Sequence, residues 1–260
     1  MLAFLVFCKD ERKNAAATRA RKASTIRIYF KYLTNTKRIL TVDPAAELET
    51  PKLKKALPRY LTLEESLHLL EIIDGPYKER DYCIVTFFLN CGMRLAELCA
   101  LNLSSFGSDG SLTLIGKGNK ERVIYLNEAC ANALNAYLPK RPVDGVRGDD
   151  RNALFLSKQL KRISNKTVQH LVYTYLEKAG YGDRGLSVHK LRHTAATLMY
   201  QHGNVDIRIL KDILGHANLG TTQIYTHLSD EQVRKAIDSN PLASVNKNKS
   251  KNSGESNEDI

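Results

Sequence analysis

The fold of this chain is decided by the stretch SVHKLRHTAATLMYQHGNVDIRILKDILGHANLGTTQIYTHL, residues 187–228. Ser187 is a typical N-cap, and the apolar residues after it recur at helical spacing, which predicts a first helix. A second helix is predicted after Asp206, which can cap it, and ends at Gly215, where a positive φ costs little. A third, short helix is predicted to start at the following threonine pair and to carry Tyr225.

Reactive side chains accompany this helical pattern. His189, Arg192 and His193 fall at i, i+3 and i+4 and share one helix face, and His216 follows the turn that ends the second helix. An arginine offers a planar fork for phosphate oxygens, a histidine moves protons near neutral pH, and the hydroxyl of Tyr225 can attack phosphorus. Taken singly, each residue has a simpler interpretation, because a buried histidine or an interfacial tyrosine is usually structural.

Together these residues resemble box II of the tyrosine recombinases, the phage-integrase family, and especially its Xer-like members. The matching segments are H-x-L-R-H at 189–193, L-G-H at 214–216, and QIYTHL around Tyr225, which lies nine residues after His216. A spaced pattern of this length is much more specific than a single glycine motif. The resemblance covers roughly residues 18–238.

A second motif, MRLAEL at residues 93–98, resembles the family's box I, G-L-R-x-S-E-L. Arg94 matches the first catalytic arginine, and Glu97 matches the acidic residue that orients the site. Met93 and Ala96 depart from the commonest family residues, but both are apolar or small and are expected to leave the chemistry unchanged. The alternative is an ordinary surface ion pair between Arg94 and Glu97 at i,i+3 spacing.

Two strands, predicted at residues 112–115 and 122–126, are joined by the turn G-K-G-N-K. In the family this hairpin carries the catalytic lysine, and the resemblance assigns that role to Lys117. Lys120 and Arg122 are predicted to contact phosphates. Without the other motifs, a lysine in a turn would be interpreted as simply solvated.

Charge points to a polyanionic partner. The net charge is +11 with a pI near 9.4, and residues 1–60 hold fourteen Lys and Arg against five Asp and Glu. Arg27 and Lys31 lie on a predicted helix that begins at Ser24, opposite an apolar stripe, and are expected to contact DNA. The alternative is a solvated basic face without a ligand.

Cysteine usage and hydropathy narrow the class of protein. The five cysteines form no C-x-x-C pair and no Cys/His cluster with zinc spacing. Three of them lie in apolar helical runs and are expected to be small core residues in a reducing cytosol. The opening MLAFLVFC is too short to span a bilayer. We therefore expect a cytoplasmic protein, associated with the nucleoid when bound to DNA, with no membrane contact.

Prolines, changes in composition and loss of helical periodicity indicate domain boundaries along the chain. The predicted domains are a partial N-terminal core-binding domain at 1–49, a linker at 50–58, a catalytic domain at 59–240 and a disordered polar tail at 241–260. The resemblance implies a fold that is mainly α, with a SAM-like helical remnant followed by an α+β catalytic domain of the DNA breaking-rejoining type. A small three-stranded antiparallel sheet is expected in the catalytic domain. The apolar start of the chain is expected to have packed on helices encoded upstream.

Further helix boundaries follow from local signals. Thr62 and Glu65 form a predicted capping box, and Pro76 is expected at the first position of the next helix. Residues 165–179 are predicted to be helical, and Asp230 to cap a helix over 231–238.

The resemblance implies site-specific DNA recombination through a 3′-phosphotyrosyl link, without metal, ATP or another cofactor. The expected partners are a double-stranded recombination site and other protomers, in a homo- or hetero-tetramer on synapsed DNA formed from free monomers. Two alternatives remain: a type IB topoisomerase-like strand relaxer and a non-recombining DNA-binding accessory protein. The implied catalytic residues are Arg94, Lys117, His189, Arg192, His216 and the nucleophile Tyr225, supported by Glu97 and His193.

Overall fold

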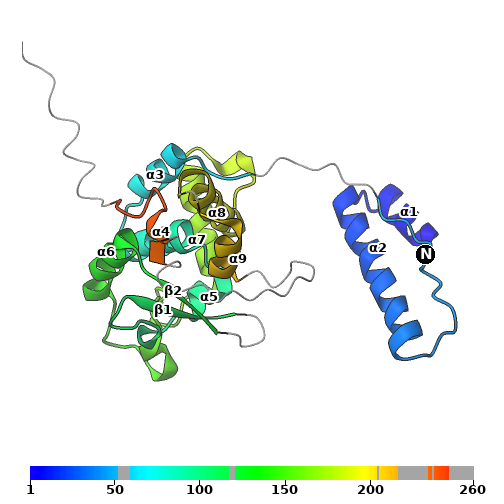
Figure 1. Cartoon of the computed structure of the whole chain (residues 1–260), viewed down its shortest axis with the longest axis horizontal. Coiled ribbons are helices and arrows are strands. Elements are labelled where there is room, and N and C mark those ends of the chain that lie inside the picture. The colour runs from blue at the N-terminus through cyan, green and yellow to red at the C-terminus, as the bar shows by residue number, and fades with distance from the viewer. Residues whose placement is uncertain (52–58, 117–120, 204, 216–233, 236, 246–260) are drawn as a thin grey trace, which may run out of the picture. The chain divides into compact units, whose positions relative to one another are not determined.

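The computed structural model describes residues 1–51, 59–116, 121–203, 205–215, 234–235 and 237–245. The chain divides into two compact units, an N-terminal unit of Met1–Pro58 and a C-terminal unit of Arg59–Ile260 (Figure 1). Among the described residues, no helix is long and apolar enough to cross a membrane.

The N-terminal unit is helical. Helix α1 spans Leu2–Asp10, and α2 spans Ala16–Lys31 and continues into a π-helical turn at Tyr32–Thr36. The predicted start at Ser24 is wrong: alanine, arginine and lysine dominate the residues just before it, and their high helix propensity carries the helix back to Ala16.

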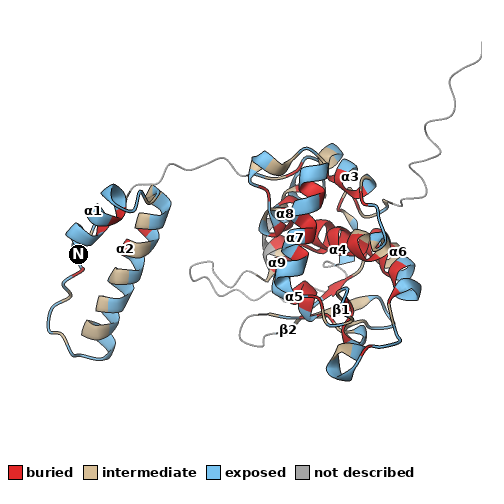
Figure 2. Cartoon of the chain, turned by 180° about the vertical axis from the view of Figure 1, so that it is seen from behind, coloured by how far each residue is buried: buried red, intermediate tan, exposed pale blue. Residues whose placement is uncertain are grey.

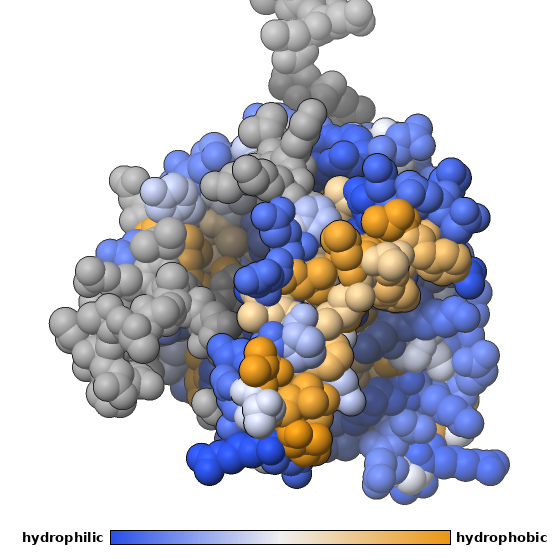
Figure 3. Space-filling model, turned by 90° about the vertical axis from the view of Figure 1, so that its right-hand side faces the viewer, coloured by the Kyte–Doolittle hydropathy of each residue, from blue (hydrophilic) through white to orange (hydrophobic). Residues whose placement is uncertain are grey.

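Apolar side chains remain uncovered on this unit. The α1 residues Leu2, Phe4, Val6 and Phe7 are between 45% and 70% exposed, whereas Leu5 is buried. In the view of Figure 3, apolar side chains gather into a band bordered by hydrophilic ones.

The C-terminal unit is built around α4, Lys78–Cys91, whose residues from Arg80 to Cys91 are nearly all buried (Figure 2). Before it, α3 spans Leu63–Glu71 and has the predicted capping box of Thr62 and Glu65. Helix α4 begins two residues after Pro76, not at it, and ends at Gly92 with a φ of 57°.

The other helices pack around this buried one or on its neighbours. Helix α6 packs against α4, and so does α8, which in turn contacts α9. The prediction of a helix at 165–179 is confirmed within one residue. The remaining elements are α5 at Leu95–Ala100, α6 at Glu128–Tyr137, α7 at Asn165–Lys178, α8 at Val188–Gly203, α9 at Ile207–Leu214, and 3₁₀ turns at Leu103–Ser105, Leu138–Lys140, Gly148–Asn152 and Gly182–Arg184.

The sheet has two strands in the described residues, not the predicted three. Strand β1, Ser111–Ile115, pairs antiparallel with β2, Glu121–Tyr125, and Leu114 faces Arg122 in the register. The segment before β1 contributes only an isolated bridge between Phe106 and Leu112. The residues directly before Phe106 form the 3₁₀ turn Leu103–Ser105 and not a strand, so the pairing stops at this bridge.

The last described segment, residues 237–245, packs on the core of the C-terminal unit. Leu242 is fully buried, and the buried Asn240 donates a hydrogen bond to Leu89 O at 2.9 Å. Ala129 N donates to Ala243 O at 2.5 Å. The polar tail was predicted to begin at residue 241, whereas this packing keeps 241–245 within the fold.

Candidate active site

Glu97 is the centre of the site. It lies in the first turn of α5, is 4% exposed, and its Oε2 accepts the backbone N–H of Arg94 at 2.7 Å. The side chain of Arg94 also donates from Nη1 to Oε1 at 2.7 Å. The predicted i,i+3 pair is therefore present, as a buried carboxylate that fixes an arginine at a helix N-terminus.

Arg122 approaches the same carboxylate from strand β2. Its Nη1 and Nη2 donate to Oε1 and Oε2 of Glu97 at 2.7 and 2.8 Å, which is the bidentate geometry of a strong ion pair. Its Nε donates to Ile213 O in α9 at 3.0 Å. Sequence reasoning grouped Arg122 with the phosphate contacts, but each of its guanidinium nitrogens has a partner inside the protein.

These contacts fix the charge of Glu97. Burial alone would raise the pKa of its carboxyl, but hydrogen bonds from Arg122 and from the backbone of Arg94, with the charge of Arg122, lower the pKa to about 2. Glu97 is therefore ionised at neutral pH, and its negative charge offsets two guanidinium groups.

Arg192, from the second turn of α8, is buried beside this pair. It is 4% exposed, and its Nη1 and Nη2 donate to Gly92 O at 2.7 Å and to Leu214 O at 2.5 Å. Burial and the nearby charge of Arg94 lower its pKa to about 10. The guanidinium therefore stays protonated at neutral pH, and two backbone carbonyls fix its orientation.

Three arginines converge on the C-terminal end of α9. Arg122, Arg192 and Arg94 donate to the consecutive carbonyls of residues 213, 214 and 215. These carbonyls lack helical partners and carry the negative end of the helix dipole, so cations are favoured there. Local sequence patterns do not reveal this convergence, because the three arginines come from three separate elements.

Gly215 allows the close approach at this helix end. Its φ is 62°, and a Cβ added there would lie 3.2 Å from Nη1 of Arg122. The predicted helix end at Gly215 is confirmed, and the residue also provides space for a guanidinium group.

His189 and His193 lie one turn apart on α8. Their rings meet edge to face with centroids 4.7 Å apart, and both side chains are exposed. Partial burial of the ring, and then the charges of His189, Lys190 and Arg192, lower the pKa of His193. The two histidines therefore lie together on the exposed side of α8, as the sequence predicts. Arg192 lies on the buried side of the same helix.

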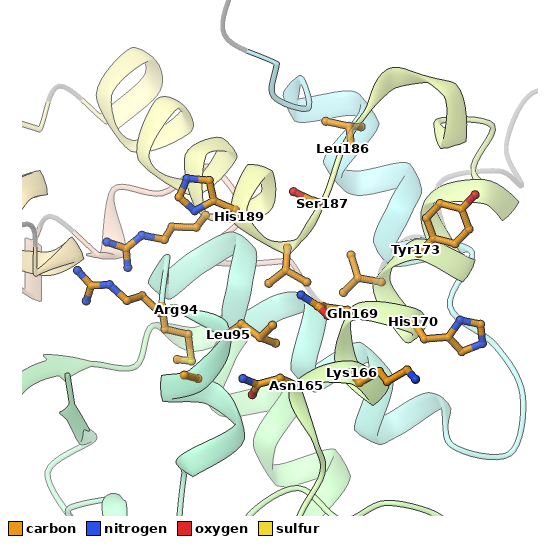
Figure 4. Close-up of a pocket in the computed structure, with 15 residues that line it drawn as sticks. Arg94, Leu95, Asn165, Lys166, Gln169, His170, Tyr173, Leu186, Ser187 and His189 are labelled. Atoms are coloured by element: carbon orange, nitrogen blue, oxygen red, sulfur yellow. The ribbon is translucent and has the colours of Figure 1, made fainter. Parts of the chain in front are cut away.

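A pocket of about 890 Å³ lies beside these residues. Arg94 and His189 lie on one side of it, and side chains of α7 lie on the other (Figure 4). Sequence reasoning missed this polar face of α7; the signal was the row of polar residues opposite the apolar positions of the helix. The α7 residues that line the pocket are Asn165, Lys166, Gln169, His170, Val172 and Tyr173.

The remaining predicted site residues separate into two groups. Lys117, Lys120, His216 and Tyr225 lie outside the described residues, with His216 directly after Gly215. Arg27 and Lys31 are exposed on α2 of the N-terminal unit and line a small pocket of about 260 Å³ there. Within the described residues, no group of three or more His, Cys, Asp or Glu could hold a metal ion.

Comparisons with known proteins extend over most of the chain. A family model described as "Phage integrase family" matches residues 59–232. The chain is 55% identical over 243 residues to the tyrosine recombinase XerC of Caldanaerobacter subterraneus subsp. tengcongensis, which covers 94% of this chain and 68% of that relative.

Solved structures agree in fold. The crystal structure of XerA recombinase has a TM-score of 0.57 and 29% identity, and the match covers 89% of this chain and 78% of that one. The XerH site-specific recombinase bound to difH substrate has a TM-score of 0.66 and 23% identity, over 84% of this chain and 63% of the other.

Proposed function

This chain belongs to the phage integrase family and is a tyrosine-type site-specific recombinase, and from this premise we propose that Tyr225 is its nucleophile on DNA. The observation that carries the assignment is the convergence of Arg94 and Arg192 on the two carbonyls that precede His216. It brings box I and box II together at one point.

In the proposed cleavage step, the hydroxyl oxygen of Tyr225 bonds to the scissile phosphorus and the bond from phosphorus to the 5′ oxygen breaks. Lys117 gives a proton to the departing 5′ oxygen, and His189 assists removal of the proton from Tyr225. A tyrosine hydroxyl has an ordinary pKa of about 10, so it needs this assistance at neutral pH. The products are a 3′-phosphotyrosyl link and a free 5′ hydroxyl, and the reverse reaction rejoins the strand.

Positive charge stabilises the transition state of this step. Charge accumulates on the equatorial phosphate oxygens, and donors that are already oriented stabilise it without reorganising. Arg94 and Arg192 supply the charge, and His216 donates a hydrogen bond. The carbonyl and carboxylate partners of the two arginines restrict their rotation before DNA binds.

The proposed partners are a double-stranded DNA site and further protomers. The structural relatives include XerH on difH substrate and a lambda integrase tetramer bound to a Holliday junction. We assign this chain the same class of substrate and a tetramer on two paired sites. The place of action is then the cytoplasm, on the chromosome.

The test starts in cells that express the chain. DNA joined covalently to the protein is recovered under denaturing conditions and sequenced, and the recovered site is synthesised as a nicked duplex. With this substrate the wild type is expected to form an SDS-resistant adduct, and a plasmid with two copies of the site is expected to yield deletion products. Relaxation of the plasmid without deletion would instead indicate a strand relaxer.

Two tyrosine variants locate the nucleophile. Tyr225→Phe keeps the ring and removes the hydroxyl, so no adduct is expected. Tyr200→Phe changes an exposed tyrosine of α8 in the same way and is expected to leave adduct formation unchanged. An undiminished adduct in Tyr225→Phe would refute the assignment.

A further inference from the structure

We propose that Arg122 is a positioning residue: it ties strand β2 to Glu97 and to the end of α9, and the step assigned to Lys117 depends on this tie. The inference rests on the proposed function, because it assigns Arg122 a role through the lysine that protonates the leaving oxygen. In this role Arg122 affects the transfer of a proton to the leaving 5′ oxygen, and it does not stabilise the charge on the phosphate.

The geometry gives Arg122 three anchors on two other elements. Both oxygens of Glu97 in α5 and the carbonyl of Ile213 in α9 accept its hydrogen bonds, at 2.7, 2.8 and 3.0 Å. The side chain is 15% exposed, and its partner carboxylate is 3% exposed. A forked guanidinium in a partly buried pair is a rigid link, unlike a solvated surface cation.

Arg122 lies close to Lys117 along the hairpin. It is the second residue of β2 and faces Leu114, and the segment that carries Lys117 joins β1 to β2. Within the described part of the chain, the side-chain hydrogen bonds from β2 to α5 and α9 all come from Arg122. The side chain therefore couples the hairpin to the site at the end where the connecting segment begins.

Removing Arg122 leaves the other arginines with their partners. Glu97 retains two hydrogen bonds from Arg94, one from the backbone and one from Nη1. Leu214 O and Gly92 O retain Arg192. Leu112, Leu114 and Ile124 keep the two strands in the core, so the change removes the polar tie beside the segment that joins them. The step that depends on Lys117 is therefore the one expected to slow.

The experiment compares two leaving groups in single-turnover cleavage of a nicked duplex that carries the recovered site. One duplex has the natural 5′ oxygen at the scissile bond, and the other has a bridging 5′ sulfur. A sulfur leaving group needs little protonation, so it bypasses the general acid. Arg122→Gln is expected to cleave the oxygen substrate on the order of 10²-fold more slowly than wild type, and the sulfur substrate within about threefold of it.

Companion variants separate positioning from folding. Lys117→Ala is expected to show the same pattern as Arg122→Gln, because both lose the acid. Arg122→Lys keeps the charge but lacks the fork, so it is expected to lie between wild type and Arg122→Gln on the oxygen substrate and near wild type on the sulfur substrate. The matched control is Arg162→Gln, because Arg162 is a partly buried arginine that bonds Cys99 O, Leu101 O and Asn102 Oδ1 and not the carboxylate of Glu97. Both substrates are expected to be cleaved by Arg162→Gln at the wild-type rate.

Either of two results overturns the inference. An equal loss on both substrates would place Arg122 in charge stabilisation or in folding, and an undiminished rate on the oxygen substrate would show that it is dispensable. The same assay also measures the Tyr225-dependent adduct of the wild type. That adduct tests the proposed function, and the comparison of the two substrates tests the role of Arg122.

Discussion

The candidate site cations of the two units are held in opposite ways. In the C-terminal unit, Arg192 is 4% exposed and bonded to two carbonyls, and Arg122 grips both oxygens of Glu97. In the N-terminal unit, Arg27 and Lys31 are exposed on α2, and Arg27 makes a long hydrogen bond to Thr50 at 3.4 Å.

The difference separates two uses of positive charge. Guanidinium groups with their rotamers fixed by buried acceptors provide a preorganised field, which is what a transition state requires. Exposed cations contribute to DNA affinity mainly by releasing counterions, which is sensitive to salt and tolerant of position. Substitutions in the two units are therefore expected to differ in size and in kind.

The largest effect is expected from Glu97→Gln. The variant leaves two arginines beside a buried neutral amide, and breaking a buried ion pair costs about 3 kcal/mol of unfolding free energy. Denaturant unfolding measures this loss, and adduct formation is expected to fall on the order of 10²-fold because Arg94 loses its orientation. The control is Glu65→Gln, which weakens a more exposed pair with Arg184 and is expected to cost less than about 1 kcal/mol. Similar losses in both variants would mean that Glu97 is an ordinary ion-pair partner.

Acid unfolding gives an independent check on Glu97. Its pKa falls from an ordinary 4.5 to about 2 in the folded protein, so the unfolded chain binds more protons between these values. The stabilisation by this carboxylate is present above about pH 4.5 and is lost as the pH falls towards 2. The difference in unfolding free energy between wild type and Glu97→Gln is expected to shrink over this window and to stay constant from pH 5 to 7.

An intermediate effect is expected from Gly215→Ala. A left-handed φ costs a non-glycine residue about 1–2 kcal/mol, and the new methyl would also press on Arg122. Gly180→Ala is the matched control, since its φ is 79° and a Cβ there meets nothing within 4 Å. Both variants are expected to lose similar stability in thermal unfolding, and only Gly215→Ala is expected to slow adduct formation. Equal activity of the two would disprove the role of this close approach.

The smallest effect is expected from the N-terminal unit. Arg27→Gln and Lys31→Gln are each expected to reduce the slope of log affinity against log salt by about 0.9 and to leave the cleavage rate of bound DNA unchanged. Binding is measured in a Tyr225→Phe background, so that cleavage does not interfere. Lys140→Gln, an exposed lysine of the C-terminal unit outside the site described above, is expected to leave the slope unchanged. An unaltered slope in the α2 variants would remove this helix from the DNA contact surface.

Local signals in the sequence predicted local structure well. The capping box at Thr62, the helix end at Gly215 and the contact between Arg94 and Glu97 all follow from residues within three or four positions, and the structure contains each of them. Serine is a good cap and favours a helix start at Ser24, but the strong helix formers before it extend the helix back to Ala16.

Contacts between distant segments were not predicted. Arg122 was interpreted from its motif as a phosphate contact, because no periodicity links it to Glu97, 25 residues earlier, or to Ile213, 91 residues later. The family resemblance implies a third strand, whereas the 3₁₀ turn at Leu103–Ser105 limits the pairing with β1 to one bridge. The contacts of Arg122 and the pairing of strands depend on how separate elements pack together. The spacing of residues along one helix or strand does not predict that packing.

Both ends of the segment that carries Tyr225 are fastened to the unit that contains Arg94 and Arg192. At one end Arg94 bonds Gly215 O, and at the other Arg234 donates to Asp109 O at 3.2 Å and lies 3.9 Å from the centre of the Tyr125 ring. The proposed nucleophile, Tyr225, is thus part of a segment tied at both ends, and its local concentration depends on the length of connecting chain and not on the amount of protein in solution. Attack on a phosphate held in that site is then a first-order process, with a rate that dilution of the protein–DNA complex leaves unchanged.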